Sequence, residues 1–266
     1  MSSILKHVRV LTFGGNFILF VEIKRAMVYN LLVTERVDIM KHLIETHCHT
    51  QETSNCAHMP AEKVVKLYAS MGYDGLVISD HLHAYTFKRK ILNENPQATW
   101  EEKVDCFLKG YKAALKEAEN HPGFKVYLGC ELRFDEFDND YLIYGLSEEK
   151  LRDMKDIHEK ETFEGFKILK EHGCSIIQAH PFRDDMTIIE PCHYDGVEVH
   201  NGHPGHDSRN DIAFEWAKHF DYIMTSGSDF HGEHKPNSGI FVDELPEDEE
   251  GLRQLILSRN FSLKTI

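Results

Sequence analysis

The sequence predicts an α/β protein, and most of the chain fits a single TIM-type barrel. From Met40 onward, apolar runs of strand length alternate with segments whose apolar residues recur at helical spacing. Side chains of the kinds that bind metals follow several of the predicted strands, which is where such barrels hold their active sites. A length of 266 residues is ordinary for one barrel of this kind, so we expect one main domain.

The alternation can be followed element by element along the chain. Strands are expected over residues 42–47, 75–79, 124–130, 175–179, 196–199 and 222–226. Helices are expected over residues 61–71, 100–120, 162–172, 210–219 and 248–258. Gly72 and Gly173 each end a predicted helix directly before an apolar strand, as expected of repeated βα units. Such units predict a mostly parallel sheet.

The first 39 residues do not follow this scheme. They contain apolar stretches but none of the candidate ligands. Two interpretations are open: a hairpin packed on the outside of the domain, and a poorly ordered extension that precedes the true start of the protein. We expect the second, and we place the N-terminal extension at residues 1–39 and the barrel domain at residues 40–266.

The chain is acidic, with a formal net charge of −14 at pH 7. Tight binding to a nucleic-acid backbone depends on clustered Lys and Arg, so we expect no high-affinity nucleic-acid partner. Bound divalent cations can reverse the local field, and an acidic protein can hold an anionic substrate through its metals. The composition is therefore compatible with a small anionic substrate.

The cysteines and the apolar runs bear on the compartment. Six cysteines are scattered along the chain without a CxxC pair, as in proteins of reducing compartments, so we expect no disulfides. Cys48 and Cys130 are expected to be small buried thiols rather than zinc ligands. No apolar run approaches the about 20 residues of a membrane span, and residues 16–24 lack a signal-peptide cleavage pattern. We expect a soluble, cytoplasmic protein with no membrane partner.

The clearest chemical signal is a His-x-His pair, His47 and His49, at the end of an apolar run. Residues two apart on a strand point to the same face, so these two imidazoles would form a chelating pair while Cys48 points away. One such pair alone can equally be an exposed decoration of a strand. It is accompanied, however, by further His, Asp and Glu residues in strand-end segments: Asp80, His81, Glu131, His180, Asp229 and His231.

Taken together and in order, these motifs resemble the PHP family, the polymerase and histidinol phosphatase domain. The resemblance extends from Met40 to the C-terminus. It implies a distorted (β/α)7 TIM-like barrel that holds two or three divalent metal ions, commonly zinc, manganese or iron, at the C-terminal ends of its strands. It also implies hydrolysis of a phosphate ester, with a small phosphorylated metabolite or nucleotide as substrate.

The resemblance also implies an assignment of ligands. One metal would be held by the four residues that form the catalytic centre: His47, His49, Glu131 and Asp229. Glu131 would bridge to a second metal that also takes His180, and a third metal would take His81 and His231. A bridging carboxylate between two cations offsets their mutual repulsion, which agrees with this division.

The chain departs from the family pattern in two places. Many members have a histidine shortly before the glycine that corresponds to Gly145, where this chain has none; either Asp140 substitutes for it or the second metal is held more weakly. The family also places an acid or a histidine shortly after the first motif. Glu52 and His58 are both candidates for this third-site ligand, and we expect Glu52 because it is nearer to the pair.

Several other side chains are candidates for the mouth of the site. Arg183, three residues after His180, is placed to clamp a phosphate with its planar guanidinium, although a plain surface arginine is an equally good interpretation. Strand alternation puts Glu198 and His200 on one face. Four more histidines follow motif strands: His83, His203, His206 and His234.

The function predicted from these residues is metal-dependent hydrolysis of a phosphate ester by a metal-activated water. An amidohydrolase-type reaction is the first alternative, since such enzymes also use a His-x-His on the first strand and a late Asp. The chain offers no evident strand-end lysine for a carbamylated bridge, which weighs against it. A catalytically silent barrel stabilised by metals is the second alternative.

Overall fold

The computed structural model describes residues 8–13, 16–21, 42–190 and 192–265 of the chain. The chain divides into two compact units, Met1–Asp38 and Ile39–Ile266. In the first unit, β1 (Val8–Phe13) pairs antiparallel with β2 (Asn16–Val21). Much of the predicted extension, including residues 22–39, lies outside the described residues, so its assignment stays a prediction.

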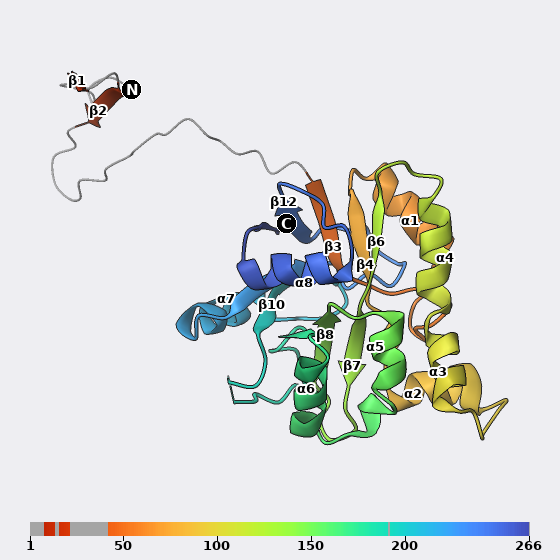
Figure 1. Cartoon of the computed structure of the whole chain (residues 1–266). Coiled ribbons are helices and arrows are strands. Elements are labelled where there is room, and N and C mark those ends of the chain that lie inside the picture. The colour runs from red at the N-terminus through yellow and green to blue at the C-terminus, as the bar shows by residue number, and fades with distance from the viewer. Residues whose placement is uncertain (1–7, 14–15, 22–41, 191, 266) are drawn as a thin grey trace. The chain divides into compact units, whose positions relative to one another are not determined.

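The second unit contains two sheets (Figure 1). The five-stranded sheet has the order β13 (Ser262–Lys264), β12 (Gly239–Val242), β3 (His42–Cys48), β4 (Gly75–Ile78), β6 (Lys125–Leu128). The six-stranded sheet has the order β11 (Ile223–Gly227), β10 (Gly196–Asn201), β9 (Ser175–Gln178), β8 (Asp140–Tyr144), β7 (Cys130–Arg133), β5 (His81–Leu82). Both sheets belong to one α/β unit.

The two sheets are joined at two places. The chain passes from β4 into β5 and from β6 into β7, and the backbone of Gly129 donates to that of Ile78 at 2.9 Å where these segments cross over. On the other side, Cys48 and Phe230 form an isolated parallel bridge next to β3. The described strands do not form one closed sheet, so the predicted closed barrel is not found, while the α/β class is confirmed.

The prediction of a mostly parallel sheet is wrong for the neighbours of two strands, β8 and β12, and the latter is antiparallel to β13 as well. β8 runs antiparallel to both β7 and β9, and β12 runs antiparallel to β3. β7 and β8 are joined by only six residues without a helix, and such a short connection requires an antiparallel pair. In the second unit, the neighbours that do not involve β8 or β12, including β3 with β4 and β10 with β11, are parallel as expected.

Helices cover the outer faces of the sheets. They are α1 (Ala61–Ser70), α2 (Ala84–Phe87), α3 (Trp100–Phe107), α4 (Lys109–Ala118), α5 (Glu148–Asp153), α6 (Thr162–Glu171), α7 (Asn210–His219) and α8 (Glu249–Ser258). A π-helical turn spans Lys88–Leu92 and a 3-10 turn spans Ile157–Glu159. Figure 1 shows α1 beside α4 next to β4 and β6. The helix predicted over residues 100–120 is divided at Leu108.

The strands are buried on both faces, and this makes them a rigid frame for the residues at their ends. Ile44, Val77 and Leu142 have no exposed surface and belong to one apolar cluster between the sheets. On the opposite face of β3, Cys48 packs in a second cluster with residues of α1. Burial on both faces explains why the strands appear as near-continuous apolar runs. Among the described residues, no helix combines the length and apolar content that a bilayer span requires.

Candidate metal centre

The His-x-His pair lies at the end of β3, in the centre of the second unit. Nε2 of His47 and Nε2 of His49 are 3.1 Å apart, and both side chains are fully buried. The side chain between them, Cys48, packs in the apolar cluster beside α1. The two imidazoles therefore face one another on the side of the strand away from that cluster.

Hydrogen bonds at the other ring nitrogens determine which nitrogen of each imidazole carries the proton. Nδ1 of His47 is 2.9 Å from Oε1 of Glu198, and a carboxylate accepts only from a protonated nitrogen. Nδ1 of His49 is 3.1 Å from Oγ of Ser54, whose own proton is donated to Asp80 at 2.6 Å. Ser54 must therefore accept from His49. In the neutral state, both Nε2 atoms carry lone pairs.

Two buried carboxylates approach the same point. Oδ1 of Asp229 is 3.4 Å from Nε2 of His47 and 3.3 Å from Nε2 of His49. Glu131 lies 3.4 Å from His47 through Oε1 and 3.3 Å from His49 through Oε2. Burial opposes ionisation of both acids, yet the charge of His47 and hydrogen bonds from neighbouring histidines hold their pKa values well below the ordinary range.

These groups have the properties of a cation site. Two imidazole lone pairs and two carboxylates converge, and protons on both facing Nε2 atoms would lie against one another. Burial disfavours a charged His47, but three nearby carboxylates raise its pKa well above the usual value: Asp229, Glu198 and Glu131. The carboxylates therefore stabilise a positive charge at this point. A divalent metal would supply that charge with a ligand set of imidazole and carboxylate, which suits zinc, manganese or iron.

A second group forms around the other side of Glu131. Nε2 of His180 is 3.0 Å from Oε1 of Glu131 and 3.8 Å from Oδ2 of Asp140. One ligand atom from each of these three residues lies within 4.8 Å of the others. Asp140, one of the two alternatives at the position without a histidine, is thus close enough to share a metal with Glu131 and His180.

Two arginines hold Asp140. Arg133 donates from Nε and Nη2 to the two carboxylate oxygens at 2.7 and 2.6 Å, and Nη2 of Arg183 lies 3.3 Å from Oδ2. Hydrogen bonding to Asp140 raises the pKa of Arg133, so this guanidinium remains charged. A carboxylate shared by two arginines has less electron density to offer a metal than a free one. The same carboxylate fixes the orientation of two cationic side chains.

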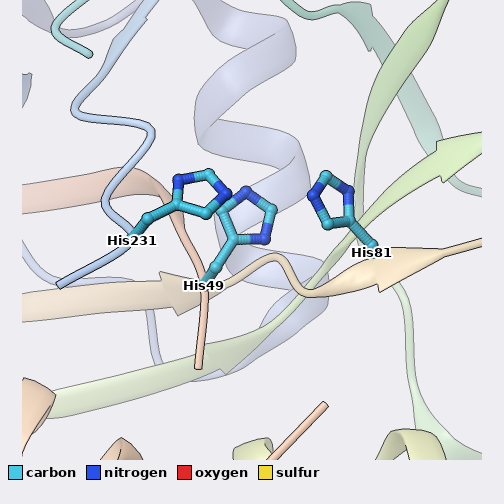
Figure 2. A group of neighbouring side chains, drawn as sticks. All are labelled: His49, His81 and His231. Carbon is cyan, nitrogen blue, oxygen red and sulfur yellow. The ribbon is translucent and has the colours of Figure 1, made fainter. Parts of the chain in front are cut away.

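A third group consists of three histidines (Figure 2). Ring nitrogens of His49, His81 and His231 lie within 4.8 Å of one another, and the rings come from three separate segments. Nδ1 of His81 is also 2.8 Å from Oε2 of Glu131. Burial, followed by the charge of His49, lowers the pKa of His231 to about 3, so its imidazole is neutral and has a lone pair.

Backbone conformation helps to place two of the candidate ligands. His180 has φ of +29° and Asp229 has φ of +47°, in a region that non-glycine residues rarely adopt. Such conformations cluster at functional sites, where the surrounding structure holds them. Nearby, a Cβ on Gly227 would lie 2.4 Å from Cβ of His47 and 2.8 Å from Glu198, so only glycine fits this position.

The structure brings together seven of the predicted ligands, His47, His49, His81, Glu131, His180, Asp229 and His231, and it places Glu52 and His58 elsewhere. Both carboxylate oxygens of Glu52 accept from the backbone nitrogen of Ala61, at 3.1 and 3.0 Å, at the start of α1. His58 is exposed and pairs with Glu233. Neither side chain joins the cluster, although the backbone nitrogen of His58 donates to the backbone oxygen of His231 at 2.8 Å. The side chain found beside His81 in the wall of the site is Cys56.

Strand alternation predicted that Glu198 and His200 share one face of their strand, and the structure does not show this arrangement. The register of β10 shifts between Glu198 and His200, as at a bulge, so the two side chains do not share a face in the expected way. Glu198 contacts His47 at the centre, whereas Nδ1 of His200 lies 3.2 Å from the side chain of Asn210. Glu198 is a charged residue inside an otherwise apolar strand, and that feature of the sequence could have indicated a functional role.

A cavity of about 590 Å³ opens over the cluster. Its wall includes His81, Glu131, Asp229 and His231 together with both arginines, Arg133 and Arg183. The structure places Arg183 in this wall, with Nη1 3.4 Å from Nε2 of His180, and its role as a phosphate clamp stays a prediction. The role of Arg133 had no sequence signal, because an arginine at a strand end is ordinarily a surface residue.

The PHP domain family matches residues 45–258, which is most of the chain. The chain therefore belongs to the PHP family. The match confirms the resemblance seen in the ordered histidine and acidic motifs. No curated protein sequence matches the chain.

Three solved structures are similar to this chain in fold. A two-domain protein from Bacteroides vulgatus that contains a predicted PHP-like metal-dependent phosphoesterase has 19% identity and a TM-score of 0.61, over 84% of this chain and 64% of its own. A metal-dependent phosphoesterase, so named provisionally, from Bifidobacterium adolescentis covers 82% of this chain and 96% of its own, at 18% identity and a TM-score of 0.49. An amidohydrolase from Chromobacterium violaceum with bound sulfate covers 84% of this chain and 98% of its own, at 13% identity and a TM-score of 0.49. This PHP chain thus spans 64% of the length of the first of them.

Proposed function

We propose that this PHP protein hydrolyses a phosphate ester of a small molecule, with divalent metal ions bound at the cluster. The family supports a metal-dependent hydrolase. The phosphate-ester specificity, and a small phosphorylated metabolite or nucleotide as substrate, are our proposal. Water oxygen forms the new bond to phosphorus, the ester P–O bond breaks, and the leaving oxygen takes a proton to give an alcohol.

One observation carries this proposal: the lone pairs of His47 and His49 face each other at 3.1 Å between two buried carboxylates. We assign His47, His49, Glu131 and Asp229 to one metal. Glu131, His180 and Asp140 would hold a second, and His81 and His231 a third, with zinc, manganese or iron as the ions. Bound ions of this kind lower the pKa of water and offset the charge of phosphoryl oxygens.

The arginines support the choice of a phosphate substrate. Arg183 and Arg133 line the cavity above the cluster, and both are oriented by the buried carboxylate of Asp140. An oriented guanidinium binds two phosphate oxygens through parallel N–H groups and loses little conformational freedom in doing so. The cavity wall also includes the carboxylates of Asp138, Asp184, Asp185 and Asp207, so it is acidic overall without metal. The two guanidiniums are its local cations, and bound metal ions would supply the further positive charge that an anionic substrate needs.

The proposal also includes the compartment, the partners and the alternative reactions. We place the protein in the cytoplasm, which its six free thiols support, and we expect neither a membrane partner nor tight binding to nucleic acid. An amidohydrolase-type reaction and a catalytically silent metal-stabilised domain are the two alternatives. They differ in what the metal-loaded protein hydrolyses, so one experiment separates them.

The test is phosphate release from p-nitrophenyl phosphate and a panel of phosphomonoesters and phosphodiesters. The protein is stripped with a chelator and reloaded with manganese or zinc. Activity should vanish in chelator and return with metal, and His49→Ala or Asp229→Asn should lower turnover by orders of magnitude. His58→Ala is the matched control, because it removes an exposed side chain outside the cluster and keeps the backbone N–H that bonds to His231.

Three outcomes would go against the proposal. Phosphatase activity that persists in chelator, or survives both substitutions, would show that the cluster is not the catalyst. Hydrolysis of amides without phosphate release would favour the amidohydrolase alternative. Metal binding without hydrolysis of any ester or amide would favour the silent domain.

A further inference from the structure

A second cavity of about 610 Å³ adjoins the one above the cluster. The two cavities share four wall residues: Cys56, His81, Arg133 and Asp138. A molecule with its phosphate over the metals can therefore extend past Arg133 into the second space. Ligand cavities of this size bind small molecules rather than proteins.

The second cavity has an aromatic wall. Tyr85, Phe134, Phe137 and the imidazole of His83 line it. Tyr85 is 55% exposed and Phe137 is half-buried, so both can present ring surface to the cavity. Phe134 is 1% exposed, and its ring packs against Phe166 in the core behind the wall. The rings of His83 and Tyr85 are nearly parallel, at 27° with centroids 6.3 Å apart, so they present aromatic surface in one orientation.

Neighbouring contacts hold these two rings in place. Nδ1 of His83 accepts from the backbone nitrogen of Thr86 at 3.2 Å, at the start of α2. An imidazole that accepts at Nδ1 is neutral and carries its proton on Nε2, where it can donate to a ligand. The guanidinium of Arg89 lies 5.9 Å from the centre of the Tyr85 ring, within cation–π range.

Arg133 separates the two spaces. Its guanidinium is fixed on Asp140 from one side and lines both cavities. Because Arg133 lies in both walls, an ester whose phosphate contacts it over the cluster has room to extend its alcohol into the second cavity.

This inference rests on the proposed function: we propose that the cavity beside His83, Tyr85 and Phe137 binds the leaving-group alcohol of the ester. We propose further that this alcohol carries a planar aromatic ring. Stacking on aromatic side chains tolerates any ring with a π face, so this wall selects for a ring rather than for one particular base.

The test compares two probes that differ only in the ring. AMP and ribose 5-phosphate share a primary 5′-oxygen leaving group, so their intrinsic reactivities are alike and the base is the difference. The metal-loaded full-length protein should show kcat/KM at least about tenfold higher for AMP, because stacking of one base is worth about that factor or more. Tyr85→Ala should bring the ratio close to one, and Tyr85→Phe, which keeps the ring, should retain it.

Phe163→Ala is the control, because Phe163 is 49% exposed on α6 and lines neither cavity. A wild-type ratio near one, or a ratio that Tyr85→Ala leaves unchanged or that falls as far in Phe163→Ala, would overturn the inference. If neither probe is hydrolysed, the proposed function fails for these esters, and calorimetry with the same probes decides the inference. AMP binding at least tenfold tighter than ribose 5-phosphate supports it, and equal affinities overturn it.

Discussion

Oε1 of Glu198 lies 2.9 Å from Nδ1 of His47, with both side chains fully buried. The second oxygen of the same carboxylate accepts from the backbone nitrogen of His180 at 3.1 Å and from Asn201 at 2.9 Å. Asn201 in turn donates to Asp229 at 3.1 Å. One buried carboxylate thus links three candidate ligands from three different segments, although it does not face the shared point itself.

Glu198→Gln should lower metal affinity by about 10- to 100-fold, as loss of a hydrogen-bond partner behind a histidine ligand usually does. The amide cannot accept on both sides as the carboxylate does, so the proton of His47 is no longer fixed at Nδ1. Competition with a chromophoric chelator measures the affinity. Glu164→Gln, an exposed change on α6, is the control, and equal affinity for Glu198→Gln and wild type would contradict the linking role.

The purified protein should contain more than one transition metal ion per chain, because its donor groups exceed one tetrahedral site. Elemental analysis after mild purification gives the number. Removal of the metal should also lower the melting temperature, since a ligand at 100 times its Kd stabilises the folded state by about 2.7 kcal/mol. A folded preparation that is free of metal and takes up neither zinc nor manganese would contradict a metal cluster.

Glu52→Ala should lower the free energy of unfolding by about 1 kcal/mol, because the carboxylate satisfies a backbone N–H and a positive dipole at the start of α1. Urea unfolding measures this loss. The number of bound metal ions should not change. If the variant instead loses one metal ion and unfolds at the same urea concentration, Glu52 is a ligand as the sequence interpretation had it.

The sequence could predict those cluster residues whose side-chain direction is determined by the strand that carries them. His47 and His49 converge because alternation on a strand is fixed by the backbone, and each later ligand follows or lies in a strand of the same sheets. Glu52 shows the limit: nearness along the chain to His49 does not determine which way a loop side chain turns. Its carboxylate instead accepts a hydrogen bond from the backbone nitrogen of Ala61 at the start of α1.

The parts that could not be predicted depend on contacts between distant segments. Arg133 gains its place from a bidentate contact with Asp140 across the β7–β8 pair, and the antiparallel course of β8 had no sequence pattern of its own. The bulge that separates Glu198 from His200 is likewise a product of pairing with β11. Two sheets in place of one closed barrel follow from such pairings, which hydrophobic periodicity does not encode.

Deletion of residues 1–39 should leave a folded protein that binds metal, because every candidate ligand and both cavities lie in the second unit. The melting temperatures and metal contents of the full-length and shortened proteins are compared. We expect both to agree within error. An insoluble product, or a melting temperature lowered by many degrees, would show that the first residues belong to the core of the PHP domain.

His158 should make the protein less stable in acid. Its imidazole is buried against Phe87 and Trp100, at ring distances of 4.9 and 6.0 Å. Burial, followed by the charge of Lys103, lowers the pKa of His158 to about 4 from an ordinary value of 6.5. Between these two values the unfolded chain binds a proton that the folded chain does not. The stabilisation is therefore present above pH 6.5 and is lost as the pH falls towards 4, by about 3 kcal/mol.

His158→Gln removes this titrating group, so its stability should fall less steeply in acid than that of the wild type. Urea unfolding of both proteins in chelator, from pH 7.5 to pH 4, gives the two free energies at each pH. The wild type should lose about 3 kcal/mol relative to the variant across this range, while His219→Gln, an exposed change at the end of α7, follows the wild type. Parallel curves for wild type and His158→Gln would mean that the imidazole protonates as readily in the folded chain as in the unfolded one, and burial against Trp100 would then not control its charge.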